Sequence, residues 1–289
     1  MPETLSVTFW GVRGSIAVPG PQTRRVGGNT SCVEVGLGEA RLLLDGGTGL
    51  RAAGLHLLAG TPRGRAPQAT VLVSHLHWDH VQGFPFFPPL YVRGASLRVI
   101  GPCGLAAALR RQSARPAFPV ELDAVPASLR IEEILPGQRL SLGPFDVLVG
   151  ELRHPGGALG YRVVARGQSV VYACDHEPTA SPEEDPLGSL AAGADLLIGD
   201  AQYLPAELAQ KTGWGHGSWP QLVGIARRAG VRRLVLTHHD PGRTDAAVAA
   251  LEQEARQVFP GARAAREGMR VQLGPRLARP AARAYAEQP

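Results

Sequence analysis

The hexapeptide HLHWDH at His75–His80 constrains this chain more than any other feature, because it holds three imidazoles and a carboxylate within six residues. It follows the apolar run 69–74, which predicts a buried strand. Histidine and aspartate are ligands that zinc and similar divalent ions prefer. Without a metal, four such groups packed together would be crowded and mutually unfavourable. The sequence therefore predicts a metal site on a loop at the end of a strand.

Other predicted strands also end at histidine or aspartate. The runs 145–152, 169–174 and 233–237 lead to His154, Asp175 and His238. Together with the hexapeptide, these residues put metal-ligating side chains at four strand ends. Further strands are predicted at 5–9, 32–37, 41–45, 97–100, 159–165 and 195–199, and helices at 50–58, 104–112, 218–229 and 244–258.

The H-x-H-x-D-H motif, followed by His154, Asp175 and His238 in this order, resembles the metallo-β-lactamase superfamily of hydrolases. The resemblance covers residues 9 to about 273 and implies an α/β (α+β) fold, a four-layer αββα sandwich in which helices flank two mixed β-sheets. We expect one domain over 1–273 and a frayed tail over 274–289. The resemblance also implies two divalent ions, zinc in the first place with manganese or iron as alternatives. It assigns one ion to His75, His77 and His154, the other to Asp79, His80 and His238, and the bridging position to Asp175.

Two of these positions have a competing neighbour. Cys174 precedes Asp175, but neighbouring strand residues point to opposite faces, so only one of them enters the site. We favour Asp175, which counts against a β-lactamase because many of those enzymes have cysteine there. The strand-then-histidine pattern favours His238 over His239, which would then lie behind a ligand or contact the substrate.

Four further segments narrow the resemblance to the branch with ribonuclease Z and the cyclic nucleotide phosphodiesterases. They are Gly11–Ser15, Gly28–Ser31, Asp200–Tyr203 and Gly213–Ser218. In that branch a carboxylate and a histidine form a dyad beside the metals, and the matching residues are Asp200 and His216. His216 would contact the phosphate or protonate the leaving oxygen, and Asp200 would orient it. With Asp79 they form the expected catalytic set. The alternative for His216 is to cap a glycine-rich loop.

The chain departs from ribonuclease Z in two places. The dyad carboxylate is an aspartate instead of a glutamate, and the segment 110–126, where a basic RNA-gripping arm is expected, is short and proline-rich. A large RNA footprint would show clustered lysine and arginine. We therefore predict a binuclear phosphodiesterase that hydrolyses small phosphodiesters by attack of a metal-bridging hydroxide. Among these substrates we favour 3′,5′-cyclic nucleotides. The alternatives are a transfer RNA 3′-processing endoribonuclease, a thioester or lactone hydrolase, and a catalytically silent nucleotide sensor. The complete ligand set argues against the sensor.

Two more segments allow two interpretations each. Asp45 follows a predicted strand and would either orient a metal-binding histidine or cap the next helix. The stretch Phe84–Tyr91 would either wall the pocket and stack a base, or pack as a buried loop.

Composition fits a globular protein. The 289 residues are 44% hydrophobic, and the longest apolar runs, about eight residues, fall far short of the roughly 20 that cross a bilayer. Three cysteines form no C-x-x-C pair, and no secretory signal is visible, so we expect a cytoplasmic protein. The net charge of +5 comes almost wholly from arginine. The expected partners are a small phosphodiester or nucleotide, with RNA less favoured, no membrane, and a second copy in a homodimer, as is frequent in the family.

Overall fold

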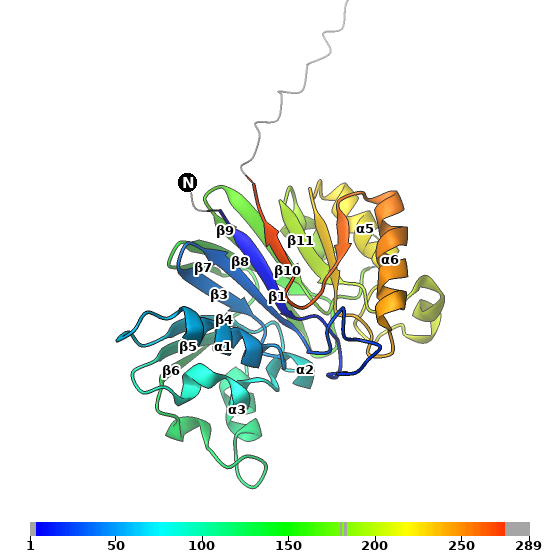
Figure 1. Ribbon diagram of the computed structural model, residues 1–289. Helices are drawn as coiled ribbons and strands as arrows, with labels where there is room; N and C mark the ends of the chain where they lie inside the picture. The colour runs from blue at the N-terminus through cyan, green and yellow to red at the C-terminus, as the bar shows by residue number, and fades with distance from the viewer. Residues whose placement is uncertain (1–3, 180, 182–183, 275–289) are drawn as a thin grey trace, which may run out of the picture.

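Two seven-stranded sheets organise the computed structural model, which describes residues 4–179, 181 and 184–274 (Figure 1). The first sheet has the order β14-β1-β2-β3-β4-β5-β6. Its strands are β1 (Ser6–Gly11), β2 (Cys32–Leu37), β3 (Ala40–Leu44), β4 (Gln68–Leu72), β5 (Ser96–Gly101), β6 (Ser128–Glu133) and β14 (Arg270–Gln272). The strands from β3 to β6 are parallel, and β1 pairs antiparallel with both β2 and β14.

The second sheet has the order β13-β12-β11-β10-β9-β8-β7. Its strands are β7 (Arg139–Leu142), β8 (Phe145–Leu152), β9 (Ala158–Ala165), β10 (Gln168–Ala173), β11 (Leu196–Asp200), β12 (Leu234–Thr237) and β13 (Ala262–Ala264). The strands from β10 to β13 are parallel, and β7, β8 and β9 form an antiparallel meander that leads into β10.

Helices cover the outer face of each sheet. They are α1 (Leu50–Gly60), α2 (Trp78–Val81), α3 (Leu105–Gln112), α4 (Pro186–Ala191), α5 (Trp219–Arg228) and α6 (Asp245–Val258). The 3-10 helices are η1 (Phe84–Phe86), η2 (Pro88–Tyr91), η3 (Leu122–Ala124) and η4 (Pro205–Gln210). The α6 helix begins where the Thr244 side chain accepts a hydrogen bond from the Ala247 amide, which satisfies one of the free amides of the first turn.

Three apolar clusters separate four layers. One fills the space between the sheets, with Phe9, Tyr161 and Tyr172 fully or nearly fully buried. A second lies between the second sheet and α4, α5 and α6, and a third between the first sheet and α1, α3 and the 3-10 helices. This arrangement confirms the predicted four-layer αββα sandwich with two mixed sheets.

The structure changes some of the predicted local elements. Asp79 and His80, which we expected on a loop, lie on the short helix α2, because the His80 amide donates to the His77 carbonyl and Gln82 to Trp78. The segment after α2 forms η1 and η2, each of which has a proline in its first two residues. The short elements β6, β7, α4, β13 and β14 were not predicted. Gly274 is the last described residue, so the rest of the predicted frayed tail lies outside the described residues.

Strand direction brings the site together. Asp45, Asp175 and His238 each follow the carboxyl end of a strand, namely β3, β10 and β12, and His154 follows β8, which runs in the same direction as β10. Carboxyl ends of strands with a common direction meet at one edge of a sheet. The candidate ligands therefore converge at one end of the sandwich.

Candidate functional site

All the residues predicted to bind metal or catalyse fall into three overlapping groups, whose ligand atoms lie within 4.8 Å of one another in each group. The groups are His75, His77, His154 and Asp175; Asp79, His80, Asp175 and His238; and Asp175, Asp200, His216 and His238. Asp175 belongs to all three. We call His75, His77 and His154 the open half of the site and Asp79, His80 and His238 the buried half.

The open half faces solvent through His77, which is exposed. His154 Nε2 lies 2.9 Å from His77 Nδ1 and 3.6 Å from Asp175 Oδ2, and His75 Nε2 lies 3.5 Å from the same carboxylate oxygen. On its other side, His154 Nδ1 donates to the Gly215 carbonyl at 2.8 Å. A carbonyl only accepts hydrogen bonds, so the proton of neutral His154 sits on Nδ1 and the Nε2 lone pair points into the site.

The buried half is tighter and excludes solvent. His80 and His238 are fully buried and Asp79 is nearly so. The two Nε2 atoms of His80 and His238 lie 3.3 Å apart, and each is within 3.0–3.3 Å of an oxygen of Asp79 and of Asp175. Burial opposes the ionised form of Asp79 and Asp175, but the neighbouring histidines hold the pKa of both carboxyls well below the ordinary value.

Asp45 supports the buried half from beneath. Its Oδ2 lies 2.7 Å from His80 Nδ1 and accepts the Tyr172 hydroxyl at 2.7 Å, while Oδ1 accepts the Ser74 amide at 2.6 Å. Such a partner fixes the tautomer and pose of a histidine ligand. Because α1 begins beyond Gly49 and Asp45 makes no capping bond there, the geometry fits the orienting role and not the helix cap.

Several residues of the candidate site have a strained backbone conformation. Ser15, Asp45, Asp175 and His238 all have positive φ angles, between 57° and 64°, and are joined outside the site only by Arg166 among the described non-glycine residues. This left-handed conformation costs on the order of 1 kcal/mol or more for such residues and tends to persist at functional sites. The strain turns the chain sharply as it leaves β3, β10 and β12, which aims these side chains into the site.

Asp200 and His216 form the predicted pair. His216 Nδ1 lies 2.7 Å from Asp200 Oδ2, and the His216 ring stacks at 5.0 Å on His238 and meets the His154 ring edge-on at 5.2 Å. Burial disfavours the charged imidazolium, yet Asp200 outweighs it and raises the pKa of His216 to about 9. The shorter aspartate therefore reaches the histidine in place of the glutamate found in ribonuclease Z.

A glutamate that the sequence did not single out holds the loop that carries His216. The Glu177 carboxylate accepts the amides of Gly213 and Gly215 at 2.8–3.0 Å, and the Glu177 amide donates to the Arg153 carbonyl. Gly215 has φ of +84°, and a Cβ there would lie 2.1 Å from the His154 ring. Only glycine fits, so this loop can approach His154 as closely as it does.

In each pair of neighbouring candidate ligands, the structure turns only one side chain toward the site. His239 turns away from the site and bonds the Ala265 carbonyl at 3.1 Å, and burial lowers its pKa to about 3. Cys174 points to the sheet interior, where its Sγ lies 3.7 Å from Ser31 Oγ. His238 and Asp175 are thus the members of each pair that face the ligand groups. The sequence assigned no individual role to three further residues, namely Ser15, whose amide donates to Asp79 at 2.7 Å, and Ser74 and Tyr172, which donate to Asp45.

The donor set fits divalent metal ions. His75 Nε2 is buried without a hydrogen-bond partner in the described part of the chain, and the polar neighbours of Asp175 Oδ1 there are the His80 and His238 Nε2 atoms at 3.1 and 3.0 Å. Leaving such atoms unsatisfied costs about 1–3 kcal/mol each. Burial, then the neighbouring His80, lowers the pKa of His75, which keeps that imidazole neutral as a metal ligand must be.

Several large apolar side chains that are close to the site residues in the sequence are exposed. Trp78 is 76% exposed beside His77, and Trp214 is 56% exposed two residues before His216. The chain's single lysine, Lys211, places its ammonium 3.8 Å from the Trp214 ring centroid. The stretch Phe84–Tyr91 is split, since Phe84, Phe87 and Leu90 are buried while Phe86 and Tyr91 are exposed. The buried residues fit the packed-loop interpretation, and contact of Phe86 or Tyr91 with a substrate stays a prediction.

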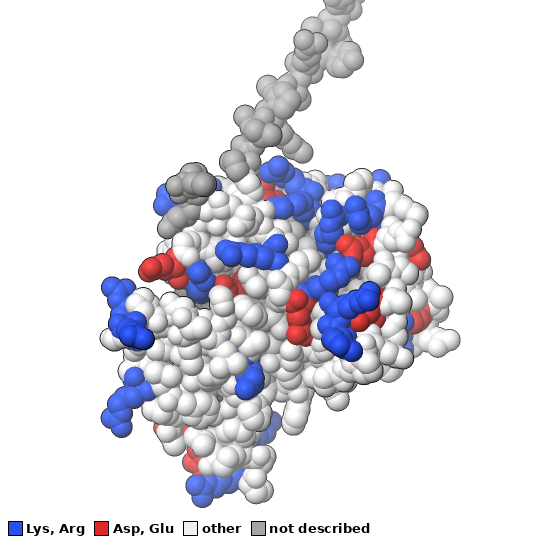
Figure 2. All heavy atoms as spheres, in the orientation of Figure 1, with Lys and Arg blue, Asp and Glu red and all other residues white. Residues whose placement is uncertain are grey.

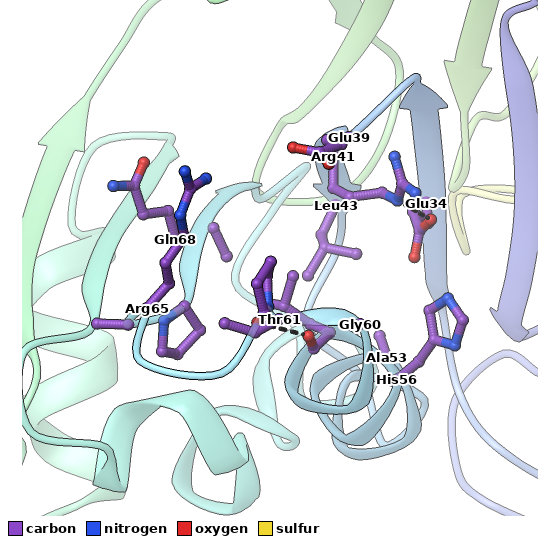
Figure 3. A pocket seen from close by; sticks show the side chains of 15 residues that line it. Glu34, Glu39, Arg41, Leu43, Ala53, His56, Gly60, Thr61, Arg65 and Gln68 are labelled. Carbon is purple, nitrogen blue, oxygen red and sulfur yellow. Dashed lines mark hydrogen bonds and ion pairs between the residues drawn. The ribbon is translucent and has the colours of Figure 1, made fainter.

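A separate hollow lies between α1 and the strands β2, β3 and β4 (Figure 3). Its volume is about 300 Å³, and Glu34, Arg41, His56 and Arg65 are among its lining residues. Arg41 pairs with Glu34 at 3.1 Å across one wall. None of the predicted metal or catalytic residues lines this hollow, so it is distinct from the site.

Comparisons with known proteins agree with this geometry. The family model of the beta-lactamase superfamily domain matches residues 40–239. Ribonuclease Z of Mycolicibacterium paratuberculosis is 33% identical over 305 aligned residues, which span 95% of this chain and 97% of that protein. The chain belongs to the metallo-β-lactamase superfamily, in its ribonuclease Z branch.

Solved structures show the same fold. The metallo-β-lactamase fold protein YhfI from Bacillus subtilis has a TM-score of 0.69 at 22% identity, covering 93% of this chain and 99% of that one. The short form of human tRNase Z has a TM-score of 0.67 at 20% identity, again covering 93% and 99%. As a superfamily member with this His and Asp set, the protein is a metal-dependent hydrolase. Its described part contains no helix long and apolar enough to cross a membrane.

Proposed function

We propose that the protein is a binuclear metal-dependent phosphodiesterase that cleaves RNA near its 3′ end. The observation that carries this proposal is the junction of the open and buried halves at Asp175, with the His216–Asp200 pair directly beside it. The sequence favours cyclic nucleotides as substrates, but relatives named ribonuclease Z support the RNA alternative better. RNA is therefore our first candidate substrate and a cyclic nucleotide the second, the reverse of the preference drawn from the sequence.

The metal roles follow the two halves. One ion would be held by His75, His77 and His154, the other by Asp79, His80 and His238, with Asp175 shared. When bound, two divalent ions supply Lewis acidity toward a phosphate and lower the pKa of water. Zinc is the first candidate, and manganese and iron suit the same donors.

His216 serves as the proton donor in this proposal. Its Nδ1 is held by Asp200 at 2.7 Å, and this carboxylate raises the pKa of the ring and so favours its protonated form. The other ring nitrogen, Nε2, is then able to donate to a phosphate oxygen or to the leaving ribose oxygen. Asp200 orients the ring and stabilises its charge, and a second bond, from the Gln202 amide at 2.9 Å, holds Asp200 itself.

A small cyclic nucleotide remains a second candidate because of the region between β5 and β6. This region contains only α3 and η3 as helices, and its Arg110 is paired with Asp123 at 3.0 Å. A partly neutralised, compact region offers little surface to a large RNA. A cytoplasmic location and a homodimer stay predictions from the sequence.

One experiment separates the candidates. The purified protein is loaded with zinc or manganese, its metal content is measured, and it is given a transfer RNA precursor with a 3′ trailer and, separately, 3′,5′-cyclic AMP. Release of the trailer, lost in Asp175→Asn, supports RNA processing. Turnover of cyclic AMP alone supports the second candidate. If neither diester is cleaved by protein with two ions per chain, phosphodiesterase function is wrong, and a thioester or lactone is the next substrate class.

A further inference from the structure

Four arginines line a groove at the side of the sandwich where each sheet has a free edge. The edge strands there are β14 of the first sheet and β13 of the second. The groove between them has a volume of about 480 Å³ and is lined by Arg233, Arg263, Arg266 and Arg270, and no carboxylate is among its described lining residues. Figure 2 shows basic side chains gathered on this face, over β13, β14 and α6.

Three of the four arginines have no carboxylate within ion-pair distance among the described residues. Among the described residues, only Arg266 of the four lies within ion-pair distance of a carboxylate, that of Glu252 on α6. Arg233 and Arg263 donate instead to backbone carbonyls, those of Gln272 at 2.9 Å and Ala262 at 2.7 Å. Such bonds position the guanidinium groups but leave their charge, so the groove keeps a positive potential.

The groove runs beside the strand that ends at the site. Leu234 and Val235 of β12 line it, and His238 follows Val235 by three residues, about 10 Å along an extended chain. At its nearer end, Arg266 follows Ala265, whose carbonyl bonds the His239 ring. The groove is therefore lined by the start of β12, and the candidate catalytic centre lies at the end of the same strand.

We propose that this arginine groove binds the phosphate backbone of the RNA substrate, away from the scissile bond. The inference rests on the proposed function. Guanidinium groups bind phosphate through paired hydrogen bonds. The lining extends along β14 from Met269 to Gln272, about 10 Å, which suits several successive phosphates better than one. A second copy of the chain fits poorly, because two-fold pairing here would oppose the same arginines.

This surface would supply what the compact region between β5 and β6 lacks. RNA affinity comes mainly from contacts between cations and phosphates, wherever the fold presents them. Here the cations lie directly before β12, on β13, on β14 and in the turn between the last two, far from Arg110 and α3 in the sequence. The groove would hold the body of the RNA while the 3′ end enters the site.

The test reverses the charge of two exposed groove residues in Arg263→Glu/Arg270→Glu. The matched control, Arg130→Glu/Arg139→Glu, makes the same change in net charge on β6 and β7, at the opposite edges of the two sheets. Binding of a fluorescently labelled transfer RNA precursor is measured by anisotropy at several salt concentrations. Hydrolysis of bis(p-nitrophenyl) phosphate reports on the catalytic centre, and thermal melting reports on folding.

We expect the groove variant to weaken precursor binding at least about tenfold at low salt and to reduce the slope of log affinity against log salt by about 1.5. Hydrolysis of the small diester should not change, and the control should bind within about twofold of the parent. The milder Arg263→Gln/Arg270→Gln variant should show a smaller loss and serves if the double reversal does not fold. If the parent cleaves RNA and both variants bind it equally, the groove proposal is wrong while the proposed function stands. If the parent neither binds nor cleaves RNA, both proposals fail.

Discussion

The open and buried halves of the site have nearly the same donors but different surroundings. His77 in the open half is exposed, with the exposed Trp78 next to it, whereas His80 and His238 in the buried half have no solvent contact. His154 is held by a single backbone carbonyl on a glycine-rich loop, and His80 by the side chain of Asp45. The buried half is thus built into the core, and the open half is the side from which substrate can approach.

The two halves also differ in the free energy needed to bury their charged groups. Burying a charged group is unfavourable unless it is paired, and here Asp45 accepts three hydrogen bonds from Ser74 and Tyr172 while facing His80. Such a network is rigid only when complete. We therefore expect substitution of Asp45, beneath the buried half, to lower metal content, and substitution of His216 to lower turnover.

The largest effect is expected where the halves meet. Asp175→Ala removes the carboxylate that lies in all three ligand groups, so both ions should be lost together. Losing the several kcal/mol of transition-state stabilisation that metals provide corresponds to at least about a 1000-fold fall in turnover. Metal analysis and diester hydrolysis on the same preparation check this. Full activity with two ions bound would show that Asp175 does not join the halves.

A smaller effect is expected for His216→Ala, which should keep both ions and lower turnover by roughly 100-fold. The His216 ring stacks on His238, but its hydrogen bond goes to Asp200, so its loss need not disturb either half. Metal content and the rate on an unactivated diester are the two readouts. Loss of an ion would instead place His216 among the ligands, as the third group of side chains permits.

Asp45→Asn tests the support of the buried half. The amide cannot accept all the bonds that the carboxylate accepts, and changing a residue that holds a metal-binding histidine in place typically costs about 10–100-fold in metal affinity. We expect one ion to leave before the other in a chelator titration. Asp185→Asn is the matched control, because Asp185 is also a buried carboxylate paired with a histidine, His176 at 2.9 Å, but outside the ligand groups. Equal metal loss in both variants would mean that the effect is general destabilisation.

The sequence predicted which side chains converge, because each candidate ligand follows a strand whose apolar pattern is clear. It could not predict the partners of Asp45, since Tyr172 lies 127 residues away and reads as part of the apolar strand β10. Glu177 was missed for the same reason, because its role depends on the loop that it meets in space. The short strands β13 and β14 have three residues each, too few for a period to show, and so the arginine groove was invisible as well.

The smallest effect is expected for His239→Gln. This variant tests whether His238, and not His239, is the histidine that binds metal in the buried half. His239 follows His238 directly, but the left-handed backbone at His238 sends the two rings to different places. Glutamine can still donate to the Ala265 carbonyl, so we expect two ions per chain, turnover within about threefold, and a loss of about 1 kcal/mol, or a few degrees in Tm. His238→Gln should lose the ion of the buried half and most activity. If the two variants exchanged these outcomes, His239 would be the ligand, and the strain at His238 would need another explanation.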